Sequence, residues 1–213
     1  MIFEMRTYTL HPGALPKYFD HVRDVGRPVR GDDYGMNHGY WASEFGTLNQ
    51  AWHLWSYDSL DDREAKRVAL SKNPRWTGEY VPGVRPLVKR QSIRFWKAAK
   101  PFEAPKTDGG FYELRMYKTN LGQAGPWCQM FKDILPVREK YAPSPNVGLW
   151  QGEAPDPNEV AHMWHYPTLD SRGAARGDLY KDPQWQAFIA RSAPMLTDLE
   201  SIILLPHPAV KVK

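Results

Sequence analysis

The chain has 213 residues, of which 42% are hydrophobic and 24% charged, and its formal net charge is +4. This composition predicts a soluble globular protein, and because Lys and Arg are interspersed with acids we expect no nucleic-acid partner. No stretch approaches the roughly 18 apolar residues of a membrane span. The single cysteine, Cys128, excludes an internal disulfide and suits a reducing compartment. Since residues 1–10 already read as a strand, with no room for a targeting peptide, we expect a cytoplasmic location.

An internal repeat runs along the whole chain. Shifting the sequence by 109 positions places "HLWSYDSLDDR" (53–63) on "HMWHYPTLDSR" (162–172). The same shift aligns Glu4, Arg6, Tyr8, Lys72, Pro74 and Trp76 with Glu113, Arg115, Tyr117, Lys181, Pro183 and Trp185. One offset from end to end indicates duplication. We therefore expect domains over residues 1–100 and 110–213, joined by a linker that contains Pro and Gly.

The first half has a legible order of elements. Residues 2–10 alternate apolar and polar side chains, which predicts a strand, and residues 12–26 carry an apolar stripe at helical spacing. Strands are expected over 38–46 and 50–58, joined by a turn. Ser59, three residues before Asp62, predicts the N-cap of a helix that runs to about residue 70.

Both halves end in the same way. Asn73-Pro74 and Asp182-Pro183 each predict a further short helix, and final strands follow over 91–96 and 201–205. Each half is therefore β-α-β-β-α-β, the ferredoxin-like arrangement. Gly173 and Gly177 should weaken the second helix of the second copy by about 1 kcal/mol each relative to Ala.

The alternation of side chains predicts how each sheet is covered. The first and third strands should be central, with both helices on one face. Phe3, Met5, Trp52 and Leu54 form the apolar set that we expect to face the helices. The other face then receives Glu4, Arg6, Tyr8, His53, Trp55 and Tyr57. Because so aromatic a face needs a cover, we predict an α+β fold: two tandem ferredoxin-like (βαββαβ) domains whose sheets pack into an intrachain dimeric α+β barrel.

The segments "FEMRTYTL", "EFGTLNQAWHLWSYDSLDDR" and "NPRW" resemble the NIPSNAP family, within the wider superfamily of dimeric α+β barrels. The resemblance covers nearly all of each half, but the second copy has "EAPDPNE" where the first has its turn. It implies a ferredoxin-like domain used in pairs and a generally bacterial, cytosolic setting, although some eukaryotic relatives are mitochondrial. It implies no reaction, because no settled catalytic mechanism belongs to this family and a fold alone does not supply one.

The predicted catalytic residues are Arg6, His53, Glu4 and Tyr8. Glu4 and Arg6 lie two apart on one strand, so they share a face, and the Arg6 fork can grip a carboxylate or enolate. His53, on the adjacent strand, can transfer a proton near neutral pH. The expected ligand-binding residues are Trp41, Trp55, Tyr57, Arg115, Tyr117, Trp150, His162 and Trp164. Any ligand is expected nearer the first copy, which keeps the family-like turn.

The sequence gives little support for a cofactor or metal site. His162 and His165 are three apart on a strand and should face opposite sides, so we expect no metal site. A haem would require an axial ligand, for which His21 is the helical candidate, and the sequence identifies no cofactor. No phosphate-binding loop, nucleophile elbow or paired-cysteine motif is present.

Two functions stay open. The first is binding, or cofactor-independent catalysis by proton transfer or oxygenation, of a small acidic or aromatic compound in the barrel interior. The second is a non-catalytic protein-interaction or scaffold module with a purely structural interior, because ion networks also bury charges. Whether the protein is an enzyme is left open. The expected partner is a small hydrophobic or acidic molecule, and a homo-oligomer is not excluded.

Overall fold

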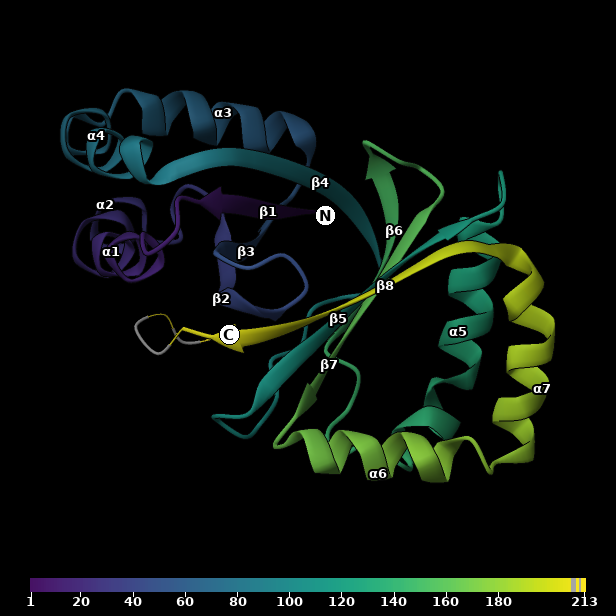
Figure 1. The fold of residues 1–213 in the computed structure, drawn as a ribbon. Helices are drawn as coiled ribbons and strands as arrows, with labels where there is room; N and C mark the ends of the chain where they lie inside the picture. Colours follow the sequence, from purple (N-terminus) through teal and green to yellow (C-terminus); the bar gives the residue numbers. More distant parts are fainter. Residues whose placement is uncertain (208–209, 211) are drawn as a thin grey trace. The chain divides into compact units, whose positions relative to one another are not determined.

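The computed structural model describes residues 1–207, 210 and 212–213. The chain forms two compact units: Met1–Phe95 with Pro206–Lys213, and Trp96–Leu205. Each unit has its own antiparallel strands and its own helices (Figure 1). No helix in the described part of the chain is long and apolar enough to cross a membrane.

The first unit follows the predicted order of strands and helices. Its elements are β1 (Ile2–Leu10), α1 (Leu15–His21), η1 (Val22–Gly26), α2 (Arg27–Arg30), β2 (Met36–Phe45), β3 (Gln50–Tyr57), α3 (Leu60–Ser71), η2 (Trp76–Tyr80), α4 (Val81–Val84), η3 (Arg85–Leu87) and β4 (Val88–Lys100). The Ser59 hydroxyl caps α3 by accepting from the backbone N–H of Asp62 at 3.0 Å, as predicted. The helix expected over 12–26 is instead divided by the π-helical turn η1. At its end, Gly26 leaves room for Tyr80, since a Cβ there would lie 2.5 Å from that ring.

The second unit repeats this order. Its elements are β5 (Phe111–Thr119), α5 (Ala124–Glu139), β6 (Gly148–Ala154), β7 (Glu159–Tyr166), α6 (Leu169–Leu179), α7 (Pro183–Ser192), η4 (Ala193–Met195) and β8 (Leu196–Pro206). The predicted cap of α7 is confirmed, because the Asp182 carboxylate accepts from the backbone N–H of Gln184 at 2.8 Å. In Figure 1, α5 and α7 run side by side, and α6 lies across their lower ends.

Strand pairing places equivalent residues in equivalent registers. In the first unit β3 lies between β1 and β2, with Arg6 opposite His53 and Tyr40 on the other side of His53. In the second unit β7 lies between β5 and β6, with Arg115 opposite His162. β5 also pairs with β8. The polar residues of the repeat therefore occupy matching positions on two neighbouring strands of each sheet.

The strand order is β1-β3-β2 within the first unit and β8-β5-β7-β6 within the second. The boundary between the units falls within β4, after Phe95, and the residues after Leu205 return to the first unit. There the backbone N–H of His207 donates to the carbonyl of Tyr40 at 2.9 Å. The predicted α+β fold, with two tandem βαββαβ copies, is confirmed.

The prediction of which sheet face meets the helices is wrong. Arg63 of α3 pairs with Glu4, and Tyr18 of α1 packs edge-on against Tyr8 with ring centroids 6.0 Å apart. The polar face of β1 therefore lies under the helices, while Phe3 and Met5 are buried on the opposite face. Alternation separates the two faces of a strand but does not say which one the helices cover. Here the helices carry arginines that neutralise a polar sheet face.

Candidate binding pockets

A pocket of about 490 Å³ lies in the first unit, on the helix-facing side of the sheet. Arg6, Tyr8 and His53 line its sheet side. Helical residues, among them Arg67 of α3 and Trp76 of η2, line the opposite side. The site therefore lies between a sheet and its helices, not in the barrel interior where it was expected.

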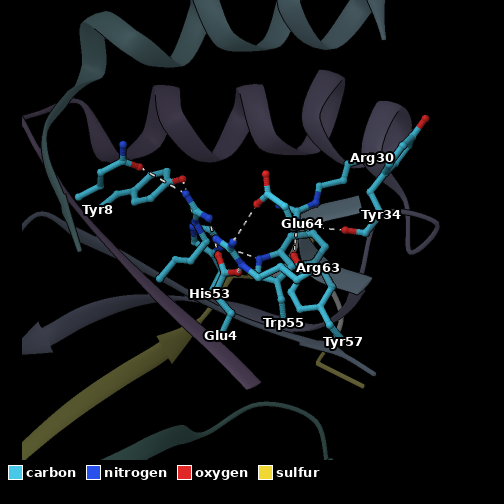
Figure 2. A network of polar contacts seen from close by, with 11 residues as sticks. Glu4, Tyr8, Arg30, Tyr34, His53, Trp55, Tyr57, Arg63 and Glu64 are labelled. Atoms are coloured by element: carbon cyan, nitrogen blue, oxygen red, sulfur yellow. Dashed lines mark hydrogen bonds and ion pairs between the residues drawn. The ribbon is translucent and has the colours of Figure 1, made fainter. Parts of the chain in front are cut away.

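Glu4 anchors the polar network beneath this pocket. Its two carboxylate oxygens accept from different guanidinium groups, one from Arg6 and the other from Arg63. Figure 2 shows Glu4 and Arg63 in this network. The side chain of Glu4 is 0% exposed. Burial opposes its ionisation, but the charges and hydrogen bonds of Arg6 and Arg63 outweigh burial and hold the pKa of Glu4 below its usual value. Glu4 is thus a buried counter-ion, and both of its oxygens are occupied.

Arg6 is held in place by the residues around it. Besides Glu4, it donates from Nε to the Tyr8 hydroxyl at 3.1 Å and from Nη2 to the Gln91 side chain at 3.4 Å. Two oxygen partners on strand β1 fix the plane of the guanidinium, so its remaining N–H groups have a defined direction. A pre-positioned fork of this kind suits a carboxylate or another planar anion.

His53 is a neutral hydrogen-bond donor. Its Nδ1 accepts from the indole N–H of Trp55 at 2.6 Å (Figure 2), and because an indole can only donate, the ring proton must reside on Nε2. Burial, followed by the charges of Arg6 and Arg30, lowers the pKa of His53 well below its usual value. Its buried Nε2 finds no hydrogen-bond partner among the described residues. His53 can therefore donate to an acceptor, which differs from the expected proton transfer near neutral pH.

Arg30 completes the polar wall. Its guanidinium carbon lies 3.3 Å from the centroid of the Trp55 ring, and Nη2 donates to the Tyr57 hydroxyl at 2.7 Å. The predicted residues Trp55 and Tyr57 thus support Arg30 at the site. Tyr40, which the sequence did not single out, stacks on His53 with ring centroids 4.8 Å apart.

Positive charge dominates this pocket. The cationic residues that line it are Arg6, Arg30, Arg67, Arg85, Lys89 and Arg90, and no acidic side chain lines it. Burial and the charges of Arg6 and Arg63 lower the pKa of Arg67, as expected where like charges crowd. A bound anion would relieve that repulsion.

The second unit contains the equivalent pocket, with a volume of about 230 Å³. Four of the predicted residues meet there: Arg115, Tyr117, His162 and Trp164. Glu113 accepts from Arg115, Arg172 and Ser201 at 2.7 to 2.8 Å. Burial opposes its ionisation, yet these partners lower the pKa of Glu113 to about 2. The indole of Trp164 donates to Nδ1 of His162 at 2.7 Å, so this histidine has the same tautomer as His53.

Trp41 and Trp150 do not belong to either pocket. Trp41 pairs with Trp52 and Trp150 pairs with Ala161, on strand positions that alternate with His53 and His162. They lie on the sheet face away from the helices. Their role as ligand-binding residues stays a prediction.

Several helical residues were missed. Arg63 and Trp76 had a signal, because both recur in the second half at the repeat offset, as Arg172 and Trp185. Arg30 had no such sequence signal. Its counterpart Arg138 lies 108 residues further along the chain, one residue short of the repeat offset of 109. Arg138 nevertheless repeats the same contacts, with its guanidinium carbon 4.3 Å from the Trp164 ring centroid and a 2.6 Å hydrogen bond to Tyr166.

The side chains do not favour a haem. His21 stacks on Tyr80 with ring centroids 5.4 Å apart, and its Nε2 lies 3.1 Å from the Tyr80 carbonyl. The ring nitrogen that would have to reach an iron therefore faces a backbone oxygen. Within the described ranges, no three His, Cys, Asp or Glu side chains gather closely enough to hold a metal ion.

Comparison with known proteins matches both halves of the chain to one family model, NIPSNAP, over residues 3–101 and 112–211. Protein NipSnap homolog 3A of Pongo abelii is 26% identical over 97% of this chain and 83% of its own length. A NipSnap homolog of Dictyostelium discoideum is 25% identical over 96% of this chain and 87% of its own. A provisionally assigned monooxygenase from Fusobacterium nucleatum superposes with a TM-score of 0.71 over 100% of this chain and 94% of its own, at 12% identity. That last likeness shows the fold alone.

Proposed function

The chain belongs to the NIPSNAP family, with one domain in each half, and from this premise we propose that the first unit binds a small organic anion with an aromatic or phenolic body. The observation that carries the proposal is the lining of the 490 Å³ pocket, which has six cationic side chains and no acidic one. Aromatic walls from Trp76 and Tyr80, stacked 4.2 Å apart, suit a flat ring.

Arg6 and His53 are the groups that would hold the negative charge. Both line the pocket, and both are fixed by neighbours on the same sheet face. Arg6 supplies a charged fork, and the Nε2–H of His53 supplies a neutral donor at its side. Two such donors would stabilise a carboxylate, phenolate or enolate oxygen between the sheet and its helices.

The same geometry limits the chemistry. At neutral pH the His53 ring has already committed its lone pair to Trp55, and Glu4 is doubly paired. Neither is placed to abstract a proton from a ligand. The pocket therefore favours a molecule that arrives as an anion or that ionises easily once its oxygen is held. Any turnover would depend on stabilising that anion, which is how a cofactor-independent reaction could proceed here.

Calorimetric titration with benzoate tests the proposal. We expect Arg6→Met to weaken benzoate binding roughly 10- to 150-fold, the equivalent of about 1.5 to 3 kcal/mol for a charge-assisted hydrogen bond. Arg115→Met is the matched control in the other unit and should change it little. Arg67→Gln, which leaves the Glu4 network intact, should also weaken binding.

Three results would count against this function. They are no saturable binding of benzoate to the native chain, an equal loss in Arg6→Met and Arg115→Met, and a larger loss in Arg115→Met. The first would favour the protein-interaction alternative, in which the buried ion network is purely structural.

A further inference from the structure

We propose that the pocket of the second unit is a separate site for a smaller, uncharged aromatic molecule that carries a carbonyl oxygen. This site lies entirely within residues 113–199. It is independent of the anion site proposed above, and either one can be wrong without the other.

The second pocket is small because larger rings project into it. Trp127 and Phe131 of α5 stand where the repeat places Tyr18 and Val22 in the first unit. The Phe131 ring lies 4.5 Å from the His162 ring, centroid to centroid, and Trp127 stacks on Phe131 at 4.9 Å. The remaining volume of about 230 Å³ is below the range of roughly 300 to 1,000 Å³ typical of drug-sized ligands. It suits a molecule with a single ring.

The walls of the second pocket are also less polar than those of the first. At the repeat offset, Tyr40, Tyr80 and Arg90 of the first pocket are replaced by Leu149, Ile189 and Leu199. Ile189 and Leu199 line the second pocket, and Leu149 is buried opposite His162 on the neighbouring strand. An apolar ring gains about 25 cal/mol for each Å² that such walls remove from water.

The strand that carries the pocket residue Leu199 is more acidic than its counterpart in the first unit. Lys89 and Gln91 of β4 correspond to Asp198 and Glu200 of β8, which flank the pocket residue Leu199. Two carboxylates there oppose the approach of an anion. Among the described residues, three arginines and one acid line this pocket, against six cations and no acid in the first pocket. Arg115 shares its charge with Glu113, Arg138 lies over Trp164, and Arg176 lies over Tyr180. Less positive charge is therefore available than in the first pocket to offset the desolvation of a carboxylate, which shifts the preference toward an uncharged ligand.

Four buried nitrogens that carry N–H groups remain to be satisfied. They are Nη1 of Arg138, Nε2 of His162 and the indole nitrogens of Trp127 and Trp185. The four side chains line the pocket and are at most 7% exposed, and none of these nitrogens has a hydrogen-bond acceptor within the described part of the chain. Donors without acceptors in an apolar pocket call for a ligand that accepts. A ketone, aldehyde or ester oxygen supplies that acceptor without adding charge.

Acetophenone and benzoate separate the two sites, since they share a ring and a similar size but differ in charge. In an NMR titration of the full chain with acetophenone, we expect saturable shifts in the second unit. His162→Phe should weaken this binding about 3- to 10-fold, the range expected for one neutral hydrogen bond. His162→Gln, which can both accept from Trp164 and donate to the ligand, should restore part of it. His53→Phe should leave it unchanged.

Trp185→Phe provides a second variant, should His162→Phe fail to fold: it keeps a flat ring but removes the indole N–H together with part of the ring system. A loss in this variant supports the site. The proposal is overturned if acetophenone does not saturate the native chain, if His53→Phe abolishes its binding, or if benzoate displaces it from the second unit at equal concentration.

Discussion

The pocket of the first unit encloses about 490 Å³ and that of the second about 230 Å³, although Arg6 and Arg115 stand at the same register opposite His53 and His162. Both units keep the carboxylate with its two arginines and the indole that fixes the histidine tautomer. Only the surrounding walls differ. The shared residues therefore form the polar core of the fold, and the choice of ligand depends on the walls.

The buried ion network of each unit could serve a ligand or only stabilise the fold. A Glu-Arg-Arg cluster that persists under two unlike pockets is explained by the fold alone, because a buried charge needs its partners wherever it lies. The side chains that report on ligands are the ones that differ, such as Tyr80 against Ile189 and Arg90 against Leu199.

The largest expected effect is on the two buried carboxylates. Glu4→Gln should lower the free energy of unfolding by about 3 to 5 kcal/mol, because it leaves Arg6 and Arg63 uncompensated. Glu113→Gln should cost less, since the side chains of Arg115 and Arg172 are 16% and 26% exposed, against 6% and 13% for Arg6 and Arg63. Urea unfolding of both variants measures the difference. If the two losses are equal, or if Glu113→Gln costs more, the two networks do not differ in burial as described.

Acid should destabilise the chain in two stages. The pKa of Glu113 is lowered to about 2, so its contribution is complete above the unfolded pKa of about 4.3 and is lost as the pH falls through the folded value. That loss is on the order of 3 kcal/mol. His53 and His162 have pKa values lowered by burial, so protonation of the unfolded chain begins to favour unfolding below about pH 6.5.

Unfolding free energies measured from pH 7 to pH 3 would show both stages. Glu113→Gln should make the profile less steep below about pH 4.5 and leave the upper stage intact, because Glu113 titrates in that lower window, where Glu4 with its lowered pKa still contributes. Replacing both histidines by Phe should flatten the profile between about pH 6.5 and 4.5. A native profile that is level down to pH 5 would show that the histidines are not held neutral by the fold.

Enlarging one buried residue of the first unit should convert the first pocket toward the second. Val22 is 0% exposed and occupies the repeat position of Phe131. We expect Val22→Phe to cost about 1 to 3 kcal/mol of stability through overpacking and to abolish benzoate binding by filling the space beside His53. Phe131→Val is the reciprocal variant and should admit a larger ligand to the second unit. Unchanged benzoate affinity in Val22→Phe would mean that this position does not set the pocket size.

The sequence predicted the order of elements, the duplication and the polar residues, because each depends on local spacing or on exact recurrence. Glu4, Arg6, His53 and Trp55 were identified from alternation on two strands. The face they occupy was not predictable in that way, since both faces of these strands are buried, and a fully buried strand loses the contrast on which alternation relies.

Two further features required the structure. The protonation of His53 depends on the indole N–H of Trp55, two residues along the same strand, and on how deeply both rings are buried. Arg30 and Arg138 depart from the repeat offset by one residue, so sequence alignment alone does not pair them. Their contacts with Trp55 and Trp164 show the equivalence that the numbering hides.

The smallest expected effect concerns the second helix of each unit. α6 contains Gly173 and Gly177 where α3 has Glu64 and Val68, and a Cβ built at either glycine meets no atom within 4 Å. Gly173→Ala and Gly177→Ala should therefore each raise the free energy of unfolding by about 0.5 to 1 kcal/mol, by reducing the freedom of the unfolded chain. Gly83→Ala is the matched opposite, because its Cβ would lie 2.3 Å from the His21 ring and should destabilise the first unit. Thermal unfolding of the three variants measures whether each substitution raises or lowers the stability. A loss of stability in the α6 variants would mean that those glycines serve a close approach of another group, and α6 would then not be the weaker copy of α3.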